Sequence, residues 1–192
     1  VLEESGQEKL LTEIEIPLAC VLSDMENEGF LVDREGLIDL GNELNDRMKS
    51  LEKEIFDTVG FTFNLNSPKQ LGEALFVKLE IPTKKKTKSG FSTSAEVLEE
   101  LKYDYPVVAL ILEYRKLTKL KSTYCDGLLN CISDDGRIHT TFNQTEARTG
   151  RISSLEPNLQ NIPVRTEDGK KLRNFFLAKD GYLLCDADYS QI

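Results

Sequence analysis

The chain has 192 residues, of which 33 are acidic and 24 are basic, so its formal net charge is −9. Hydrophobic residues make up 40% and charged residues 30%, an ordinary globular composition that excludes a disordered or fibrous protein. No apolar run approaches the roughly 18 residues of a membrane span, and the acidic start of the chain shows no secretory signal.

The first 60 residues are predicted to form two helices joined by a short extended piece. One helix is expected over residues 12–28, ended by Gly29, and residues 30–32 are predicted to be extended. Asp33 is a good N-cap for a second, long helix that ends before Gly60. Its apolar stripe predicts a helix packed along one face, with a short dimerising coiled coil as the alternative. The stripe consists of Leu37, Leu40, Leu44, Met48, Leu51 and Ile55.

The next segment is predicted to pass from an extended stretch through a short helix into a basic loop. Residues 61–66 read as extended, and Ser67 followed by Pro68 is an N-cap and first turn for a helix. Residues 81–91 contain proline, glycine and serine among several lysines, which is typical of a loop.

Two further helices are predicted before residue 130. Thr93 and Glu96 match the Thr-x-x-Glu capping box, with an apolar run directly behind them. Pro106 opens a longer helix with regularly spaced apolar residues up to about residue 130. The chain to about residue 132 is therefore predicted to be helical.

The spacing of the hydrophobic residues along the chain changes after residue 132. Residues 137–142 alternate and predict a strand, and residues 143–163 are polar and irregular. A short helix is expected near residues 170–175, and residues 182–185 are predicted to begin a buried strand. This order predicts an α+β chain whose sheet is incomplete, as in a fragment of a larger protein.

The cysteines and the single histidine, His139, restrict the possible chemistry. No two of the four cysteines form a C-x-x-C pair and no histidine cluster accompanies them, which argues against a zinc site. A catalytic triad would depend entirely on His139. We expect reduced, mostly buried thiols in a cytosolic protein.

The charge is unevenly distributed along the chain. Residues 1–60 carry 16 acidic and 5 basic side chains, whereas residues 61–192 carry 17 acidic and 19 basic ones. Because electrostatic fields act locally, the second part can bind phosphate while the first is only solvated.

The end of the chain carries two carboxylates, Asp186 and Asp188. Residues two apart on a strand share a face, so both carboxylates are placed to converge on a divalent cation such as Mg²⁺. Alternatively, only Asp188 points into a site, or both are surface carboxylates at a strand end.

Two groups of polar residues are candidates for nucleic-acid contacts. One is a donor-rich loop that suits phosphates and base edges, although a loop bonded to its own domain is the alternative. It comprises Arg148, Thr149, Gly150, Arg151, Ser153, Ser154, Asn158, Gln160, Asn161 and Arg165. The other group is basic and suits the phosphate backbone of a nucleic acid, although a merely solvated face is the alternative. It comprises Lys84, Lys85, Lys86, Lys88, Arg115 and Lys119, the last two on one helix face, with Lys116 and Lys121 nearby.

Several motifs resemble those of the family A DNA polymerases. Residues 188–192, DYSQI, resemble the start of motif A. Residues 149–154, TGRISS, and 157–165, PNLQNIPVR, resemble the run that precedes motif A in that family. Further matches to its thumb subdomain occur at residues 63–67, 92–98, 113–115 and 119–124. The resemblance covers nearly the whole chain in the family's order.

The resemblance implies an architecture and a set of site residues. It implies a junction after an exonuclease-type domain over 1–19, a helical thumb over 20–132 and the N-terminal part of an antiparallel-sheet palm over 133–192. Asp188 matches the first catalytic aspartate and metal ligand, Tyr189 matches a ligand through its backbone carbonyl, and Asp186 has no counterpart. The implied DNA contacts are Asn66, Ser67, Ser92, Thr93, Ser94, Arg115 and Lys119 in the thumb, and Arg151, Asn158, Gln160 and Arg165 in the palm.

The implied activity is DNA-directed DNA polymerisation, in which two Mg²⁺ ions assist nucleotidyl transfer from a dNTP to a primer. The partners are primer–template DNA and dNTP, with no membrane, a monomer favoured and a bacterial cytoplasmic location. We expect the 192-residue chain alone to be inactive. The alternatives are a DNA-binding module without catalysis, a phosphatase built on Asp186 and Asp188, and an acidic helical interaction protein.

Overall fold

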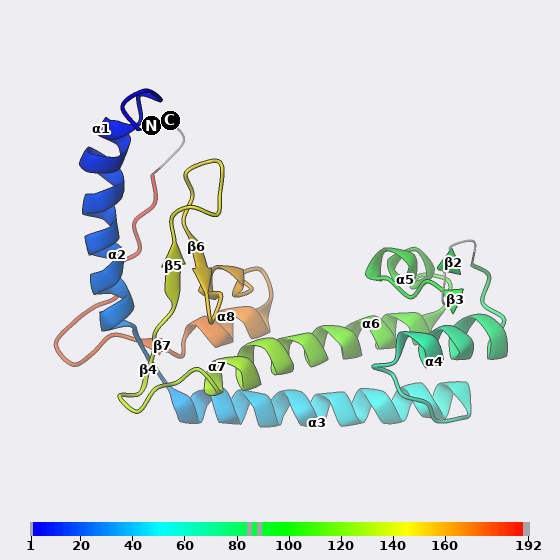
Figure 1. Ribbon diagram of the computed structural model, residues 1–192. Helices are drawn as coiled ribbons and strands as arrows, with labels where there is room; N and C mark the ends of the chain where they lie inside the picture. Colours follow the sequence, from blue (N-terminus) through cyan, green and yellow to red (C-terminus); the bar gives the residue numbers. More distant parts are fainter. Residues whose placement is uncertain (1, 84–85, 88–89, 190–192) are drawn as a thin grey trace. The chain divides into compact units, whose positions relative to one another are not determined.

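The computed structural model describes residues 2–83, 86–87 and 90–189 (Figure 1). They fall into two compact units. The two-segment unit takes its described residues from 1–40 and 123–192, and the central unit comprises the described part of 41–122. The predicted α+β class is confirmed, because helices predominate and the short strands pair in small antiparallel sheets.

A run of helix opens the two-segment unit and is drawn in blue in Figure 1. It consists of α1 (Glu8–Leu10), the π-helical η1 (Leu11–Glu15) and α2 (Ile16–Glu28), so it begins earlier than predicted. Gly29 ends it at a φ of 60°, where glycine has no Cβ to clash. The extended piece then forms as predicted and is strand β1 (Phe30–Val32).

Strand β1 lies between β4 (Arg137–Ile138) and β7 (Phe176–Leu177) in an antiparallel sheet. Its register pairs Phe30 with Ile138 and Val32 with Phe176. A second sheet pairs β5 (Thr141–Asn143) with β6 (Ser153–Leu155). The prediction of one strand over 137–142 is therefore wrong. The segment is divided because its two ends pair with different partners.

The last part of the two-segment unit contains the 3-10 turn η4 (Leu159–Asn161) and helix α8 (Glu167–Arg173), which lies slightly before the predicted helix. The buried strand predicted over 182–185 is wrong. Leu183 is 94% exposed and Leu184 is 56% exposed, and no described strand pairs with them. An apolar run becomes a strand only where a neighbouring ladder accepts its backbone groups.

Helix α3 (Arg34–Val59) is the long helix expected from its apolar stripe. Its first turn is capped as predicted, because the backbone N–H of Gly36 donates to Asp33 Oδ1 at 2.9 Å. The stripe is buried at Leu37, Leu40, Leu44 and Ile55 and half-buried at Met48 and Leu51. Packing within the molecule therefore accounts for the stripe, as the single-face prediction requires.

The central unit contains the larger part of α3, and among its described residues two short α-helices lie between α3 and α6, while residues 61–66 form no strand. Its other elements are α4 (Pro68–Glu73), the π-helical η2 (Ala74–Lys78), β2 (Lys86–Thr87), β3 (Gly90–Phe91), α5 (Ala95–Leu101) and α6 (Pro106–Lys119). Helix α6 continues through the π-helical η3 (Leu120–Asp126) into α7 (Gly127–Leu129), which confirms a helix to about residue 130. The core includes Leu71, Leu75, Leu98, Val108 and Ile111, all fully buried.

The predicted capping box of α5 is wrong. Ser94, rather than Thr93, is the N-cap residue of this helix. The hydroxyl of Thr93 instead accepts a hydrogen bond from the guanidinium of Arg115, and the Thr93 side chain is buried. A partner distant in sequence has therefore replaced the local cap.

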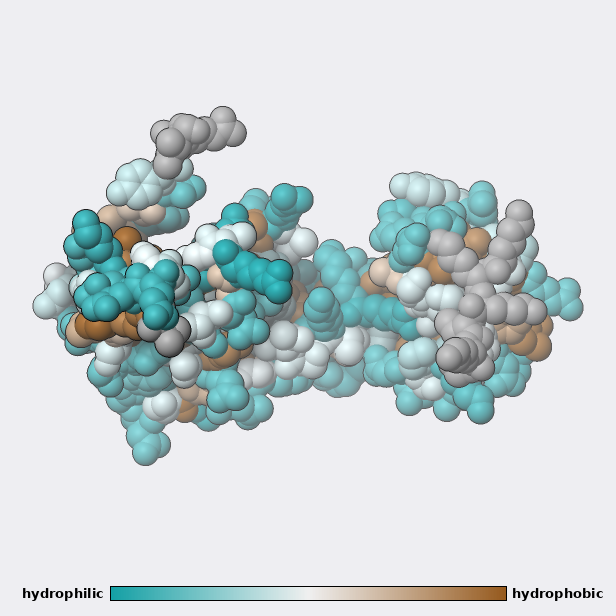
Figure 2. Space-filling model, turned by 45° about the horizontal axis from the view of Figure 1, so that its top comes forward, coloured by the Kyte–Doolittle hydropathy of each residue, from teal (hydrophilic) through white to brown (hydrophobic). Residues whose placement is uncertain are grey.

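The surface in Figure 2 is mostly hydrophilic, with smaller apolar patches between the polar residues. None of the four cysteines forms a disulfide. Only Cys125 is buried and Cys131 is half-buried, whereas Cys20 and Cys185 are exposed, contrary to the expectation of mostly buried thiols. Within the described residues no helix has the length and apolarity needed to span a membrane.

Candidate nucleic-acid interface

Two loops of the central unit carry most of the predicted thumb contacts. Asn66 and Ser67 immediately precede α4, and Ser67 caps that helix by accepting the Gln70 N–H at 3.4 Å. Residues 92–94 immediately precede α5. Pro68, the first residue of α4, and residues 92–94 line one groove of about 500 Å³.

Helix α6 holds the second of these loops. Arg115 Nη1 donates to the backbone carbonyl of Thr93 at 2.5 Å, and Nη2 donates to Thr93 Oγ1 at 3.3 Å. Arg115 is half-buried, and this burial lowers the pKa of its guanidinium, which nevertheless stays charged. Tyr114, its buried neighbour, accepts a long contact of 3.5 Å from Asn66 Nδ2.

Lys119 lies one turn beyond Arg115 and is exposed. Both side chains line an open groove of about 730 Å³ between α5 and α6, together with Lys102 and Lys116. Of the lysines predicted in the basic loop, Lys84, Lys85 and Lys88 lie outside the described residues, as does the side chain of Lys86.

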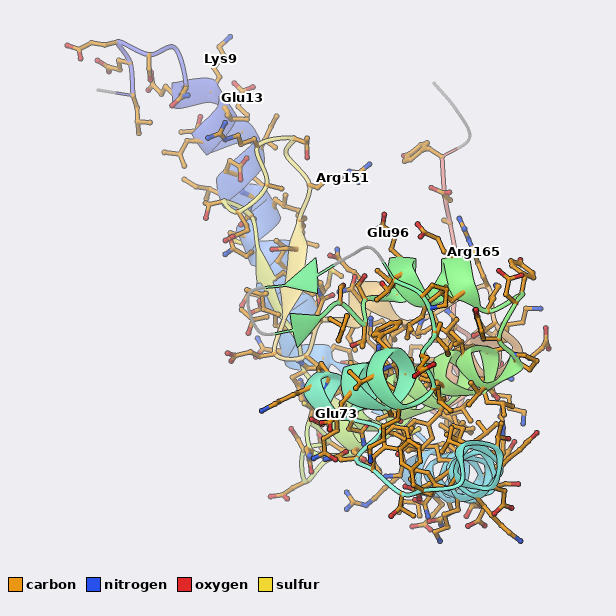
Figure 3. All side chains as sticks on the ribbon, turned by 90° about the vertical axis from the view of Figure 1, so that its right-hand side faces the viewer. Lys9, Glu13, Glu73, Glu96, Arg151 and Arg165 are labelled. Atoms are coloured by element: carbon orange, nitrogen blue, oxygen red, sulfur yellow. The ribbon has the colours of Figure 1, made fainter. Side chains whose placement is uncertain are left out.

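The predicted palm contacts lie on and after the β5–β6 pair of the two-segment unit. Arg151, Asn158, Gln160 and Arg165 are all exposed. Figure 3 shows Arg151 projecting from the loop that joins β5 and β6. Asn158 caps η4 by accepting the Gln160 N–H at 3.0 Å, and Gln160 Nε2 donates to the Ile152 carbonyl at 2.8 Å.

Buried polar groups hold this loop in place through hydrogen bonds. Thr140 Oγ1 and Ser154 Oγ are 2.6 Å apart, and Thr140 also lies 2.8 Å from the Pro157 carbonyl. Ser154 further accepts the Leu159 N–H at 3.1 Å. The hydroxyl of Tyr124 donates to the Asn161 carbonyl.

Sequence reasoning missed Thr140 and Tyr124 as supports of the loop, and it placed Ser154 among the donors for nucleic acid, whereas its side chain is buried. The sequence did offer a signal for Thr140, because this polar residue stands where the alternation of the β-rich run calls for an apolar one. Tyr124 gave none, because its partner lies 37 positions further along the chain.

The C-terminal segment carries the predicted catalytic residue. Asp186, Asp188 and Tyr189 are exposed. Within the described ranges no three His, Cys, Asp or Glu side chains are grouped to hold a metal ion. Mg²⁺ needs several oxygen ligands, of which one or two are protein carboxylates. The described residues therefore do not by themselves fit a complete two-metal site.

The α+β fold carries exposed polar side chains in each of its two units. The chain belongs to DNA polymerase family A, whose family model matches residues 34–192.

Individual relatives extend the match over almost the whole chain. It is 52% identical over 189 residues to DNA polymerase I of Lactococcus lactis subsp. cremoris (strain MG1363), which covers 98% of this chain and 22% of the relative. It is 50% identical over 193 residues to DNA polymerase I of Geobacillus stearothermophilus, again 22% of the relative. The chain thus spans about a fifth of the length of these relatives.

A solved structure matches the fold. It is described as the POL domain of Pol1 from M. smegmatis in complex with DNA primer-template and dNTP. The TM-score is 0.87 at 44% sequence identity, and the match covers 95% of this chain and 32% of the solved chain.

Proposed function

We propose that this chain is part of a DNA-directed DNA polymerase that extends a primer by nucleotidyl transfer from dNTPs. The observation that carries the proposal is the match to a solved polymerase domain in complex with primer-template and dNTP. The proposed parts are a junction over 1–19, a thumb over 20–132 and the N-terminal palm over 133–192. We further propose that the complete enzyme works as a monomer in the bacterial cytoplasm.

The thumb grips the primer–template duplex without reading its sequence. Residues 92–94 line one groove, Asn66 and Ser67 directly precede Pro68, which lines the same groove, and Lys119 is exposed on α6. Hydroxyl, amide and ammonium groups of this kind bind phosphate oxygens, which are the same for every sequence.

The palm residues act next to the primer terminus. Arg151 and Gln160 are exposed donors, and minor-groove acceptors are present on every base pair, so these side chains check base-pair geometry. Asn158 and Arg165 contact the backbone of the same duplex region. The support of their loop by Thr140 and Ser154 limits the movement of these side chains.

Asp188 supplies the first catalytic carboxylate, and the backbone carbonyl of Tyr189 adds a metal ligand. In the complete polymerase, Mg²⁺ would supply electrostatic stabilisation of the transferred phosphoryl group. Because the described residues hold no three-ligand group, we propose that the 192-residue chain alone binds duplex DNA and does not catalyse extension. This is also the second candidate function, a DNA-binding module.

The test measures binding and extension separately on the purified 192-residue chain. Binding is followed by fluorescence anisotropy of a labelled primer–template hairpin over a salt series, and extension by gel electrophoresis with dNTPs and Mg²⁺. We expect affinity to fall as salt rises, with no extension product. Absence of duplex binding at low salt would refute the thumb assignment, and template-directed extension would refute the inactivity of the chain.

A further inference from the structure

The guanidinium of Arg115 is committed to protein contacts. Two of its nitrogens donate to Thr93, one to the backbone carbonyl at 2.5 Å and one to Oγ1 at 3.3 Å. The side chain is half-buried, and the Thr93 side chain is 7% exposed. A planar guanidinium forms such a fork with little loss of freedom, whereas a lysine ammonium does not reproduce it.

The position of these contacts along the chain gives them a functional meaning. Thr93 lies between Ser92 and Ser94, and all three line the groove of about 500 Å³. Ser92 is half-buried and Ser94 is exposed, and their hydroxyls are 3.4 Å apart. Among the described residues, neither serine hydroxyl has a hydrogen bond shorter than 3.4 Å, so the tether at Thr93 between them sets their position.

Lys119 offers a contrast on the same helix. It is exposed, and among the described residues none forms an ion pair with its ammonium. It is therefore available to a phosphate, whereas the donors of Arg115 point to Thr93. Two cations one turn apart thus have different surroundings and are suited to different tasks.

We propose that Arg115 is a positioning residue. It holds residues 92–94 in place so that Ser92 and Ser94 meet the phosphates of the duplex, and Lys119 supplies the charge contact. The inference rests on the proposed function, because it assumes that the central unit grips DNA. It differs from a direct phosphate contact by Arg115 in two measurable ways.

The first difference is the salt dependence of binding. A cation that contacts a phosphate contributes about 0.9 to the slope of log affinity against log salt. Lys119→Gln is therefore expected to reduce the slope by about 0.9. Arg115→Gln is expected to weaken binding about tenfold, as when a charged hydrogen-bond pair is lost, and to leave the slope nearly unchanged.

The second difference is rescue by lysine. Arg115→Lys keeps the charge but cannot form the fork to Thr93, so we expect it to bind about as weakly as Arg115→Gln. Thr93→Val removes the Oγ1 acceptor and is expected to weaken binding in the same direction. Binding by Arg115→Lys at the level of the unmodified chain, with a slope reduced in Arg115→Gln, would overturn the proposal.

Amide hydrogen exchange measured without DNA separates positioning from a general loss of structure. Arg115→Lys is expected to accelerate exchange at residues 92–94 and to leave the core amides of α6 unchanged. Unchanged exchange at 92–94 would overturn the proposal. If the unmodified chain binds no duplex, the proposed function fails; accelerated exchange would then show only a structural tether, and the role of Arg115 in DNA binding would be overturned.

Discussion

His139 donates through Nδ1 to the backbone carbonyl of Glu26, 2.7 Å away in the last turn of α2. Its other ring nitrogen, Nε2, faces Asp135 Oδ2 at 3.1 Å. Both partners are acceptors, so the doubly protonated ring, with an N–H on each nitrogen, satisfies both contacts at once. The hydrogen bond to Glu26, followed by that to Asp135, raises the pKa of His139 above its ordinary value. The negative end of the helix dipole, at the C-terminus of α2, also stabilises a cation at this position.

The first prediction concerns pH. Because the pKa of His139 is higher in the folded chain than in the unfolded one, its contribution is fully present below the unfolded value of about 6.5. The contribution is lost as pH rises through the folded pKa. We expect urea unfolding to show a larger stability deficit of His139→Gln at about pH 6 than at about pH 8.5. An equal deficit at both pH values would contradict this.

The second prediction concerns the end of α2. A Cβ on Gly29 would lie 2.7 Å from His139 Nδ1 and 2.9 Å from the Ile138 carbonyl, at a φ of +60°. Gly60 has a φ of +79° with no atom within 4 Å of its Cβ position, so it is a matched control. We expect Gly60→Ala to cost about 1 kcal/mol from backbone strain, and Gly29→Ala about 3 kcal/mol or more. Equal losses in denaturant unfolding would show that the close approach is relieved without cost.

The third prediction concerns the support beneath the palm loop. Thr140→Val removes the hydroxyl that bonds Ser154 and the Pro157 carbonyl, which leaves buried polar groups without this partner. We expect a loss of about 1–3 kcal/mol in the free energy of unfolding. Thr141→Val, at the exposed neighbouring position on β5, should change it by less than about 0.5 kcal/mol. A loss at Thr141 as large as at Thr140 would argue against a specific buried network.

The fourth prediction concerns catalysis in the longer polymerase to which we assign the chain. Asp188→Asn should lower the rate of primer extension by about 100-fold or more, the scale on which active sites lose one electrostatic group. Duplex affinity, measured by anisotropy, should change little. Asp186→Asn is the matched control two residues away and should extend primers normally. A large loss of extension at Asp186 would restore the paired-carboxylate alternative.

Several elements were predictable because their causes are local. The stripe of α3, the Asp33 cap, the Ser67 cap and the stop at Gly29 each depend on residues within a few positions of one another. The site residues were reached through the family motifs, and their contacts with DNA stay predictions. The strand over 182–185 was wrong, because an apolar run alone does not supply a partner strand.

The sequence by itself determined the helical segments, their caps and the family, since periodicity, capping and motif order are read along the chain. Only the tertiary structure decided which side chains hold the proposed interface. Thr93 is bound by Arg115, 22 positions away, in place of a local cap. Thr140 supports the loop through Ser154, 14 positions away. The reason is physical, because a hydroxyl has several acceptors and donors within reach, and the choice between them depends on which distant groups folding brings close.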